Sequence, residues 1–214
     1  MSGVLGIDTA SDTMAVAIVE GDRVRIEARQ QPQAHSQLLL GLIDEICAGD
    51  RGRIGRIVVT RGPGGYAGVR VGVATAQGLA MSLGVPLTGV DTFAAIVEAA
   101  RGQGAVFPLV AVHPAGRGEF AMTRFDNGGR DDTVIGSLAD APDGTLCGEG
   151  MGERGGIDVT AAERCRAAIA LDARGLAQDP EALYVREPHI TLARKNPVSG
   201  VADAPPGRTR GGTS

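Results

Sequence analysis

The stretch GPGGYAGVRVGVATAQGLAMSLG, residues 62–84, decides the fold of this chain. It follows a short apolar run, residues 57–60, of the kind found in a strand that is buried on both faces of a sheet. Its first residues form a glycine-rich turn, and the apolar spacing after them predicts a helix over about residues 67–83. A strand, a glycine-rich turn and a helix in this order are typical of α/β proteins, many of which bind phosphates at such a turn.

The sequence on either side of this stretch extends the α/β pattern. Residues 23–29 alternate between apolar and charged side chains, and Gly21-Asp22 before them suits a hairpin turn, so the first three strands should form an antiparallel meander. Asp91 is well placed to cap a helix. The expected strands and helices of the first hundred residues follow the order βββαβαβα, over 4–9, 13–20, 23–29, 38–47, 57–60, 67–83, 86–90 and 92–100.

A change of composition at residues 102–104, Gly-Gln-Gly, predicts a boundary between two lobes. Beyond it, strands are expected over 107–112 and 119–125 and a helix over 160–170. The chain ends in residues rich in Gly, Pro, Arg and Thr, a composition typical of disorder. We therefore expect an N-terminal lobe of residues 1–102, a smaller C-terminal lobe of residues 103–196, and a disordered tail of residues 197–214.

The composition argues against several classes of protein. The formal net charge is −4, whereas a protein that binds nucleic acid alone needs a dense basic surface. The three cysteines, Cys47, Cys147 and Cys165, are widely spaced and form no C-x-x-C pair, which argues against a disulfide framework or a zinc knuckle. Neither a signal peptide nor an apolar run of bilayer length is recognisable, so we expect a cytoplasmic protein with no membrane contact.

The glycine-rich turn admits a dinucleotide-binding interpretation. Gly62, Gly64 and Ala67 satisfy the G-x-G-x-x-A pattern, and Asp91 lies about where a Rossmann fold places its ribose-binding acid. Pro63 removes one amide donor from the loop, and an antiparallel meander is foreign to a fold of parallel βαβ units. Dinucleotide binding therefore stays a less favoured alternative.

Asp8 ends the first predicted strand and is followed by a turn containing hydroxyl side chains. Actin-like and sugar-kinase-like folds hold a magnesium-nucleotide with a carboxylate in this place, but they have a glycine where this chain has Ala10. The favoured role of Asp8 is to organise the turn. Asp8, Gly64 and Gly65 are retained only as weak candidates for a nucleotide contact.

The histidines do not indicate a metal site. His35 would need a second ligand one helical turn on, where Leu38 and Leu39 stand, and neither His113 nor His189 belongs to a recognised metal-binding motif. No nucleophile and base can be paired from the sequence either. We therefore predict no catalytic residue, no metal and no cofactor.

A stripe of small residues runs along the predicted helix of residues 67–83. Gly68, Gly72, Ala76 and Ala80 recur every four residues, which lets another backbone approach closely. Each glycine inside a helix lowers stability by up to about 1 kcal/mol relative to alanine, so the stripe needs a compensating contact. Packing inside the protein and contact with another protein both remain open.

Longer motifs resemble the TsaB family, formerly called YeaZ, of bacterial proteins for tRNA threonylcarbamoyladenosine synthesis. The most specific match covers residues 62–80, and further matches cover residues 6–10 and 35–39, with weaker ones at residues 117–120 and 184–186. The chain departs from the family at residues 65–67, where Ser, Phe and Thr are usual, and at His113-Pro114, where an Asp is usual.

The resemblance implies an α/β, two-lobe, actin-like and ribonuclease-H-like fold of the ASKHA superfamily. It also implies a non-catalytic subunit that supports a TsaD-like catalytic subunit in making N6-threonylcarbamoyladenosine at position 37 of tRNA. A TsaE-like ATPase subunit would join them, and tRNA would be contacted only through the complex. The main alternative is an active enzyme of the same superfamily, either nucleotide-dependent or the peptidase that older family labels suggested.

In this interpretation two helices of the first lobe form the surface for the partner, and the isolated protein can pair with itself through the same surface. If Gly72 faces this surface, Gly72→Leu is expected to abolish partner binding while the isolated chain stays folded. The expected interface residues are Leu38, Leu42, Gly68, Arg70, Val71, Gly72, Thr75, Ala76 and Leu79.

Overall fold

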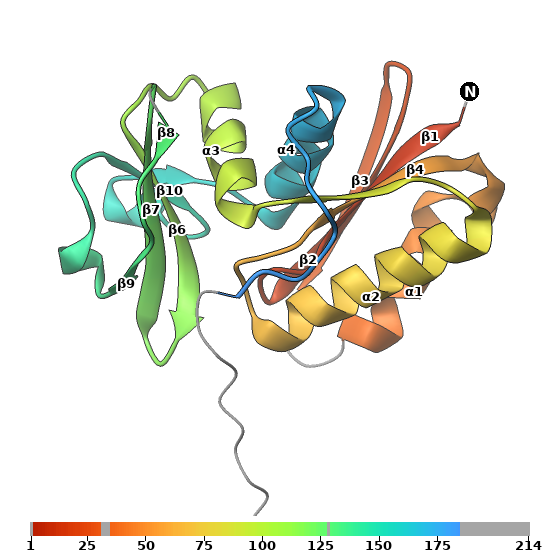
Figure 1. The fold of residues 1–214 in the computed structure, drawn as a ribbon, viewed down its shortest axis with the longest axis horizontal. Helices are drawn as coiled ribbons and strands as arrows, with labels where there is room; N and C mark the ends of the chain where they lie inside the picture. The colour runs from red at the N-terminus through yellow and green to blue at the C-terminus, as the bar shows by residue number, and fades with distance from the viewer. Residues whose placement is uncertain (1, 31–34, 128, 185–214) are drawn as a thin grey trace, which may run out of the picture.

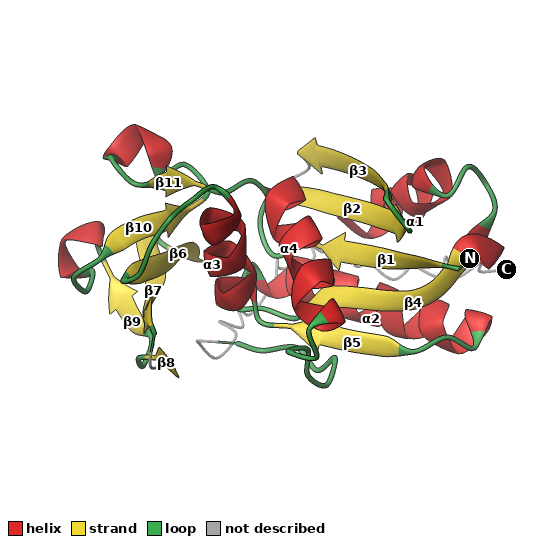
Figure 2. Ribbon diagram, turned by 90° about the horizontal axis from the view of Figure 1, so that it is seen from above, coloured by secondary structure: helices red, strands yellow, loops and turns green. Residues whose placement is uncertain are grey.

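The computed structural model describes residues 2–30, 35–127 and 129–184, so the predicted tail of residues 197–214 lies outside the described residues. The protein has two lobes, each built on a β-sheet (Figure 1). The first sheet has the strand order β3-β2-β1-β4-β5, and the second has the order β11-β10-β6-β7-β8 with β9 paired to β7. The two sheets lie next to each other with helices between and beneath them (Figure 2).

The first sheet follows the predicted pattern. Strands β1 (Gly3–Asp8), β2 (Thr13–Glu20) and β3 (Arg23–Gln30) form an antiparallel meander. Strand β4 (Ile54–Thr60) then pairs in parallel with β1 on one side and with β5 (Leu87–Val90) on the other. The meander and the buried central strand that the sequence predicts are both confirmed.

The last two helices do not pack in chain order: α3 (Thr92–Gly102) packs on the second sheet, and α4 (Ala161–Ala173), which follows that sheet in the chain, packs on the first. Helices α1 (His35–Ile46) and α2 (Tyr66–Leu83) cover one face of the first sheet, and α4 covers its other face (Figure 2). Helix α3 packs its apolar side on the second sheet and also contacts α4. The predicted boundary at residue 102 therefore separates the strands of the two sheets but not their helices.

Helix α4 is anchored at both ends. At its start Thr160 and Glu163 form a capping box. Near its end Asp172 accepts hydrogen bonds at 2.6 and 2.7 Å from Arg56 on β4 and at 2.7 Å from the Thr88 hydroxyl on β5. These contacts fix a helix from the second half of the chain on the sheet formed by the first half.

The second sheet is built from shorter strands. Its main antiparallel pair, β6 (Leu109–Gly116) and β7 (Glu119–Asp126), confirms the two strands predicted there. The region that follows is weakly patterned because its strands have only two to four residues, too few to show a period. They are β8 (Gly129–Arg130), β9 (Val134–Gly136), β10 (Thr145–Gly148) and β11 (Ile157–Asp158). Single turns of 3-10 helix connect elements at residues 51–53, 138–140 and 152–154.

The small-residue stripe of α2 faces the interior. A Cβ atom on Gly72 would lie 2.1 Å from the hydroxyl oxygen of Thr9, and that hydroxyl donates a hydrogen bond of 2.8 Å to the carbonyl oxygen of Gly68. Close packing of α2 on the turn after β1 thus explains the stripe. The Gly72→Leu expectation required Gly72 to face the partner, and this condition is not met, because Gly72 faces Thr9 and has no room for a side chain.

Two substitutions on α2 test this packing. We expect Gly72→Ala to lower the free energy of unfolding by about 1–3 kcal/mol, since the new methyl group displaces the Thr9 hydroxyl. Gly78→Ala is the control on the same helix, where a Cβ meets no atom within 4 Å. That control should raise stability by about 0.5–1 kcal/mol. Urea unfolding measures both, and equal effects would contradict the inward orientation of the stripe.

Candidate functional site

A cleft of about 690 Å³ opens between the two lobes. One wall consists of residues 9–13 after β1 and residues 65–68 at the start of α2. The other wall includes His113 and Pro114 of β6 and Glu149 after β10. Because ligands of α/β proteins commonly bind where lobes meet, this cleft is the candidate site.

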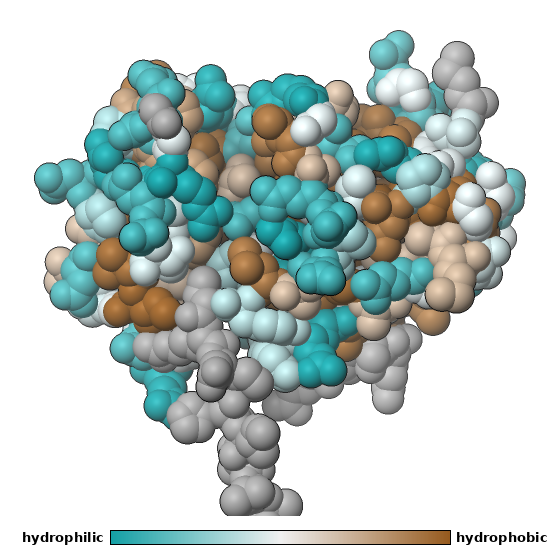
Figure 3. Space-filling view, in the orientation of Figure 1, coloured by the Kyte–Doolittle hydropathy of each residue, from teal (hydrophilic) through white to brown (hydrophobic). Residues whose placement is uncertain are grey.

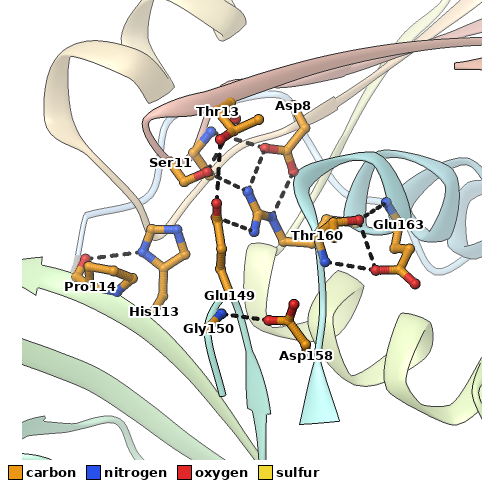
Figure 4. Close-up of polar contacts among 12 residues, drawn as sticks. Asp8, Ser11, Thr13, His113, Pro114, Glu149, Gly150, Asp158, Thr160 and Glu163 are labelled. Atoms are coloured by element: carbon orange, nitrogen blue, oxygen red, sulfur yellow. Dashed lines mark hydrogen bonds and ion pairs between the residues drawn. The ribbon is translucent and has the colours of Figure 1, made fainter. Parts of the chain in front are cut away.

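Beside the cleft lies a buried ion pair between Asp8 and Arg164, and Arg164 also contacts Ser11 and Glu149, which line the cleft. The guanidinium group of Arg164 donates to the Asp8 carboxylate at 3.2 and 3.3 Å, and both side chains are fully buried. The same group donates to the Ser11 hydroxyl at 2.8 Å and to the Glu149 carboxylate at 3.1 Å. Figure 4 shows Asp8, Ser11 and Glu149 converging on it.

The negative charge of Asp8 is neutralised within the chain by the guanidinium group of Arg164. Burial by itself would lower the pKa of Arg164, but the carboxylates of Asp8 and Glu149 more than offset this and the pKa is raised. Asp8 also accepts a hydrogen bond of 3.2 Å from the Ala10 amide, so it does organise the turn, as expected. The place where a divalent cation would neutralise a strand-end carboxylate is thus occupied by a guanidinium group.

The sequence analysis missed Arg164. The signal that could have found it is a charged residue on the apolar side of a helix, since Arg164 lies one turn from Ala161 and one turn from Ala168, which are both buried. A buried arginine requires a carboxylate partner. Only the fold shows that this partner is Asp8, 156 residues away.

The glycine-rich turn folds against the turn after β1. The amide of Gly65 donates to the carbonyl oxygen of Ala10 at 2.7 Å, and a Cβ atom on Gly64 would lie 2.5 Å from that oxygen. The structure therefore brings the three weak nucleotide candidates, Asp8, Gly64 and Gly65, into one region. Asp8 and the Gly65 amide, however, are engaged by other groups of the chain.

The carboxylate of Asp91 is engaged by other groups of the chain. It caps α3 by accepting from the Ala94 amide at 3.1 Å, as the sequence predicts, and pairs with Arg130 at 2.9 Å. The antiparallel meander on the side of β1 is equally foreign to a Rossmann fold. Both observations count against the dinucleotide-binding alternative.

His113 is a buried polar residue in the wall of the cleft. Its Nδ1 atom lies 3.1 Å from the carbonyl oxygen of Pro114, and its Nε2 atom has no hydrogen-bond partner among the described residues. Burial, and then the positive charge of Arg164, lower the pKa of His113 from 6.5 to about 4. The neutral ring therefore donates from Nδ1 and presents Nε2 as an acceptor.

The predicted interface residues separate into two groups. Val71 and Thr75 are half-buried, and Leu38 and Arg70 are exposed. The other five are buried inside the protein, on the far side of their helices from solvent, and cannot form a free surface: Leu42, Gly68, Gly72, Ala76 and Leu79.

Within the described part of the chain, no group of three His, Cys, Asp or Glu residues is arranged to hold a metal ion. In the same part, none of the helices combines the length and the apolar character needed to cross a bilayer. All three cysteines are buried and unpaired.

Comparison with known protein families gives a match over residues 28–172 to the family described as "TsaD: tRNA N6-adenosine threonylcarbamoyltransferase". The match covers more than half of the chain and runs from within β3 to the last turn of α4. The chain belongs to the TsaD family. The cleft described above is thus the inter-lobe cleft of a TsaD-family protein.

Within the TsaD family, the curated relatives that match this chain include proteins named TsaB. The chain is 33% identical over 113 residues to the tRNA threonylcarbamoyladenosine biosynthesis protein TsaB of Escherichia coli, a match that covers 51% of this chain and 49% of the relative. It is 34% identical over 99 residues to TsaB of Bacillus subtilis, covering 42% and 41%. These matches span about half the length of the curated relatives or less.

The solved structure of YeaZ from Pseudomonas aeruginosa confirms the fold. It superposes with a TM-score of 0.67 at 24% identity and covers 86% of this chain and 100% of that chain. The two-lobe, actin-like α/β fold and the TsaB or YeaZ resemblance expected from the sequence are confirmed.

Removing the guanidinium group should leave the Asp8 charge buried and unpaired. We expect Arg164→Leu to lower the free energy of unfolding by about 3–5 kcal/mol, and a second substitution, Asp8→Val, to recover a large part of the loss. Arg166→Leu is the matched control, because Arg166 is exposed on the same helix and its replacement should change stability by about 0.5 kcal/mol or less. Similar losses for Arg164→Leu and Arg166→Leu in urea unfolding would show that the pair does not organise the fold.

His113 should make stability depend on pH. Its folded pKa of about 4 lies below the value of 6.5 in the unfolded chain, so the unfolded state binds a proton first as the pH falls. The free energy of unfolding should then drop by about 2 kcal/mol between pH 7 and pH 5 through this group alone. Urea unfolding of the wild type and of His113→Phe at both pH values isolates the contribution. Parallel pH profiles would contradict the burial of a neutral ring.

Proposed function

We propose that this chain is a non-catalytic subunit of the machinery that makes N6-threonylcarbamoyladenosine at position 37 of tRNA. In this role it supports a TsaD-like catalytic subunit in the cytoplasm. The observation that carries the proposal is the buried Arg164 guanidinium group on Asp8, in a chain of the TsaD family. A catalytic member of an actin-like fold would need that carboxylate for a metal-bound nucleotide.

The relatives support the biosynthetic part of the proposal. Proteins named for tRNA threonylcarbamoyladenosine biosynthesis match this chain at 33–34% identity. The best-matched sequence motif, residues 62–80, contains the glycine-rich turn and most of α2. In this chain α2 is therefore the element that we expect to carry the shared role.

The supporting role agrees with the chemistry of the cleft. Asp8 is paired with Arg164, and the Gly65 amide, which a phosphate would need, donates to Ala10. The alternative, an active enzyme that depends on a nucleotide, would require these groups to change partners. The chain does not hold its strand-end carboxylate in a form ready for a cation.

The outer face of α2 supports a docking role. We define this face as Arg70, Val71, Ala74, Gly78 and Met81, which follow one another on the side of the helix opposite the buried stripe. Exposed helix faces are normally polar. Of the exposed residues of α2, Arg70, Gln77 and Ser82 are polar, whereas Ala74, Gly78 and Met81 between them are small or apolar. Met81 is 85% exposed.

Helix α1 extends this apolar region. It packs beside α2 on the same face of the first sheet, and Leu38 and Leu40 are about 40% exposed on it. In the view of Figure 3, hydrophobic side chains also gather on the right of the molecule, where α2 lies. An exposed apolar surface over two neighbouring helices suits the packing of helices from another protein.

We propose this surface for the TsaD-like subunit, with a TsaE-like ATPase subunit joining the assembly and tRNA contacted only through it. In the absence of the partner, the same surface can pair two copies of the chain. The proposed interface retains Leu38, Arg70, Val71 and Thr75 from the sequence-based set and adds Leu40, Ala74, Gly78 and Met81.

Ala74→Arg places a long charged side chain at the centre of the outer face of α2. We expect it to weaken binding to the TsaD-like protein of the same organism by 2 kcal/mol or more, roughly a thirtyfold loss of affinity, because the charge must be buried or the helices must separate. Co-purification and calorimetry measure the effect, and circular dichroism checks that the isolated chain stays folded.

Val106→Arg makes the same type of change at a 77% exposed residue between α3 and β6 and serves as the control. It should leave the affinity unchanged. Normal binding by the Ala74→Arg protein, or equal losses for both proteins, would rule out the outer face of α2 as the docking surface.

A further inference from the structure

Two polar features of the inter-lobe cleft belong neither to the Asp8–Arg164 ion pair nor to the proposed docking surface. The first is the Nε2 atom of His113, which is buried, accepts hydrogen bonds, and has no partner among the described residues. His113 is 3% exposed and lines the cleft. In Figure 4 its ring is directed toward the turn that carries Ser11 and Thr13, across the cleft. A buried acceptor in this position calls for a donor.

The second feature is the N-terminus of α2. Its N-cap residue is Gly65, and no side chain in the described part of the chain caps it. Residues 65–68 line the same cleft as His113. The Gly65 amide already donates to Ala10. The amides that follow it in the first turn have no partner within the helix and lie at the positive end of its dipole, so they attract an anionic group.

The remaining charges of the cleft limit the kind of anion. Glu149 and Asp12 also line it, whereas the Arg164 guanidinium group is already engaged by Asp8 and Glu149. A phosphate with two negative charges would be repelled by these carboxylates. A ligand with a single carboxylate and a nearby ammonium or hydroxyl group fits better. Its carboxylate would face the amides of α2, and its donor group would face His113 and Glu149.

We propose that the cleft binds a small amino acid or hydroxy acid. The carboxylate of the ligand accepts from the first amides of α2, and its hydroxyl or ammonium group donates to Nε2 of His113, with Glu149 as a neighbouring acceptor. The volume of about 690 Å³ lies in the range of small-molecule sites. This site goes beyond the docking role, although the cleft meets the docking surface at Val71.

The test uses the isolated chain, so that its outcome does not depend on the partner subunit. L-Serine is the first probe because it carries the carboxylate, the ammonium group and the hydroxyl. NMR titration should show saturable binding of L-serine and of D-glycerate. Ethanolamine should bind at least about tenfold more weakly because it lacks the carboxylate and loses one of the two contacts. Inorganic phosphate should bind at least about tenfold more weakly because the carboxylates of the cleft repel its second charge.

Two variants locate the site. Gly65→Asp places a carboxylate at the N-cap, where the backbone allows a side chain and a Cβ atom would lie 3.6 Å from its nearest neighbour. It should raise Tm, because the helix gains a cap, and yet weaken L-serine about tenfold or more by occupying the same amides. Gln77→Asp adds the same charge to an exposed residue of α2 outside the docking face and should leave L-serine binding unchanged.

His113→Phe removes the acceptor and keeps the ring volume, and it should also weaken L-serine about tenfold. The proposal is overturned if L-serine binds equally well to the wild type, Gly65→Asp and His113→Phe, because the ligand then lies elsewhere. Tighter binding of ADP than of L-serine would instead indicate a nucleotide site. The absence of binding at millimolar concentrations would mean that water alone satisfies these polar groups.

Discussion

The buried ion pair between Arg164 and Asp8 is the interaction on which the arrangement of the two lobes depends. Both side chains are excluded from water, and an unpaired charge in such a place would lower stability by several kcal/mol. The pair therefore holds α4, which follows the second sheet in the chain, on the first sheet beside the end of β1. Through Glu149 the same guanidinium group also contacts the second lobe, so one cation connects three distant segments.

This constraint explains why the helices do not stay with the strands that precede them. Helix α4 is tied to the first sheet at Arg164 and again at Asp172, which pairs with Arg56 and Thr88. Helix α3 packs against α4 and turns its apolar side to the second sheet. The lobes are therefore joined by packed helices as well as by the chain connection. The cleft between them is a consequence of that arrangement, with the ion pair beside it.

The same interaction connects structure with function. In this chain of the TsaD family, the strand-end carboxylate of Asp8 is paired with a guanidinium group of the chain itself. The glycine-rich turn closes on Ala10 and so positions α2 against the turn after β1. The buried small residues of α2 let this helix lie close to the turn after β1. The opposite side of α2 carries small and apolar residues that are exposed, such as Met81. A supporting subunit that docks through α2 is consistent with both sides of this helix.

The sequence by itself determined the features that depend on neighbouring residues. Periodicity predicted the meander of β1–β3, the buried strand β4 and helix α2, Asp91 was recognised as the cap of α3, and the motif at residues 62–80 indicated the family. Local preferences act over a few residues, so they could not show that Arg164 meets Asp8, that Gly72 faces Thr9, or that α3 and α4 exchange sheets. They also could not show that His113 is buried beside an inter-lobe cleft. Only the tertiary structure decided these points, because each one depends on the path of the chain between residues far apart in the sequence.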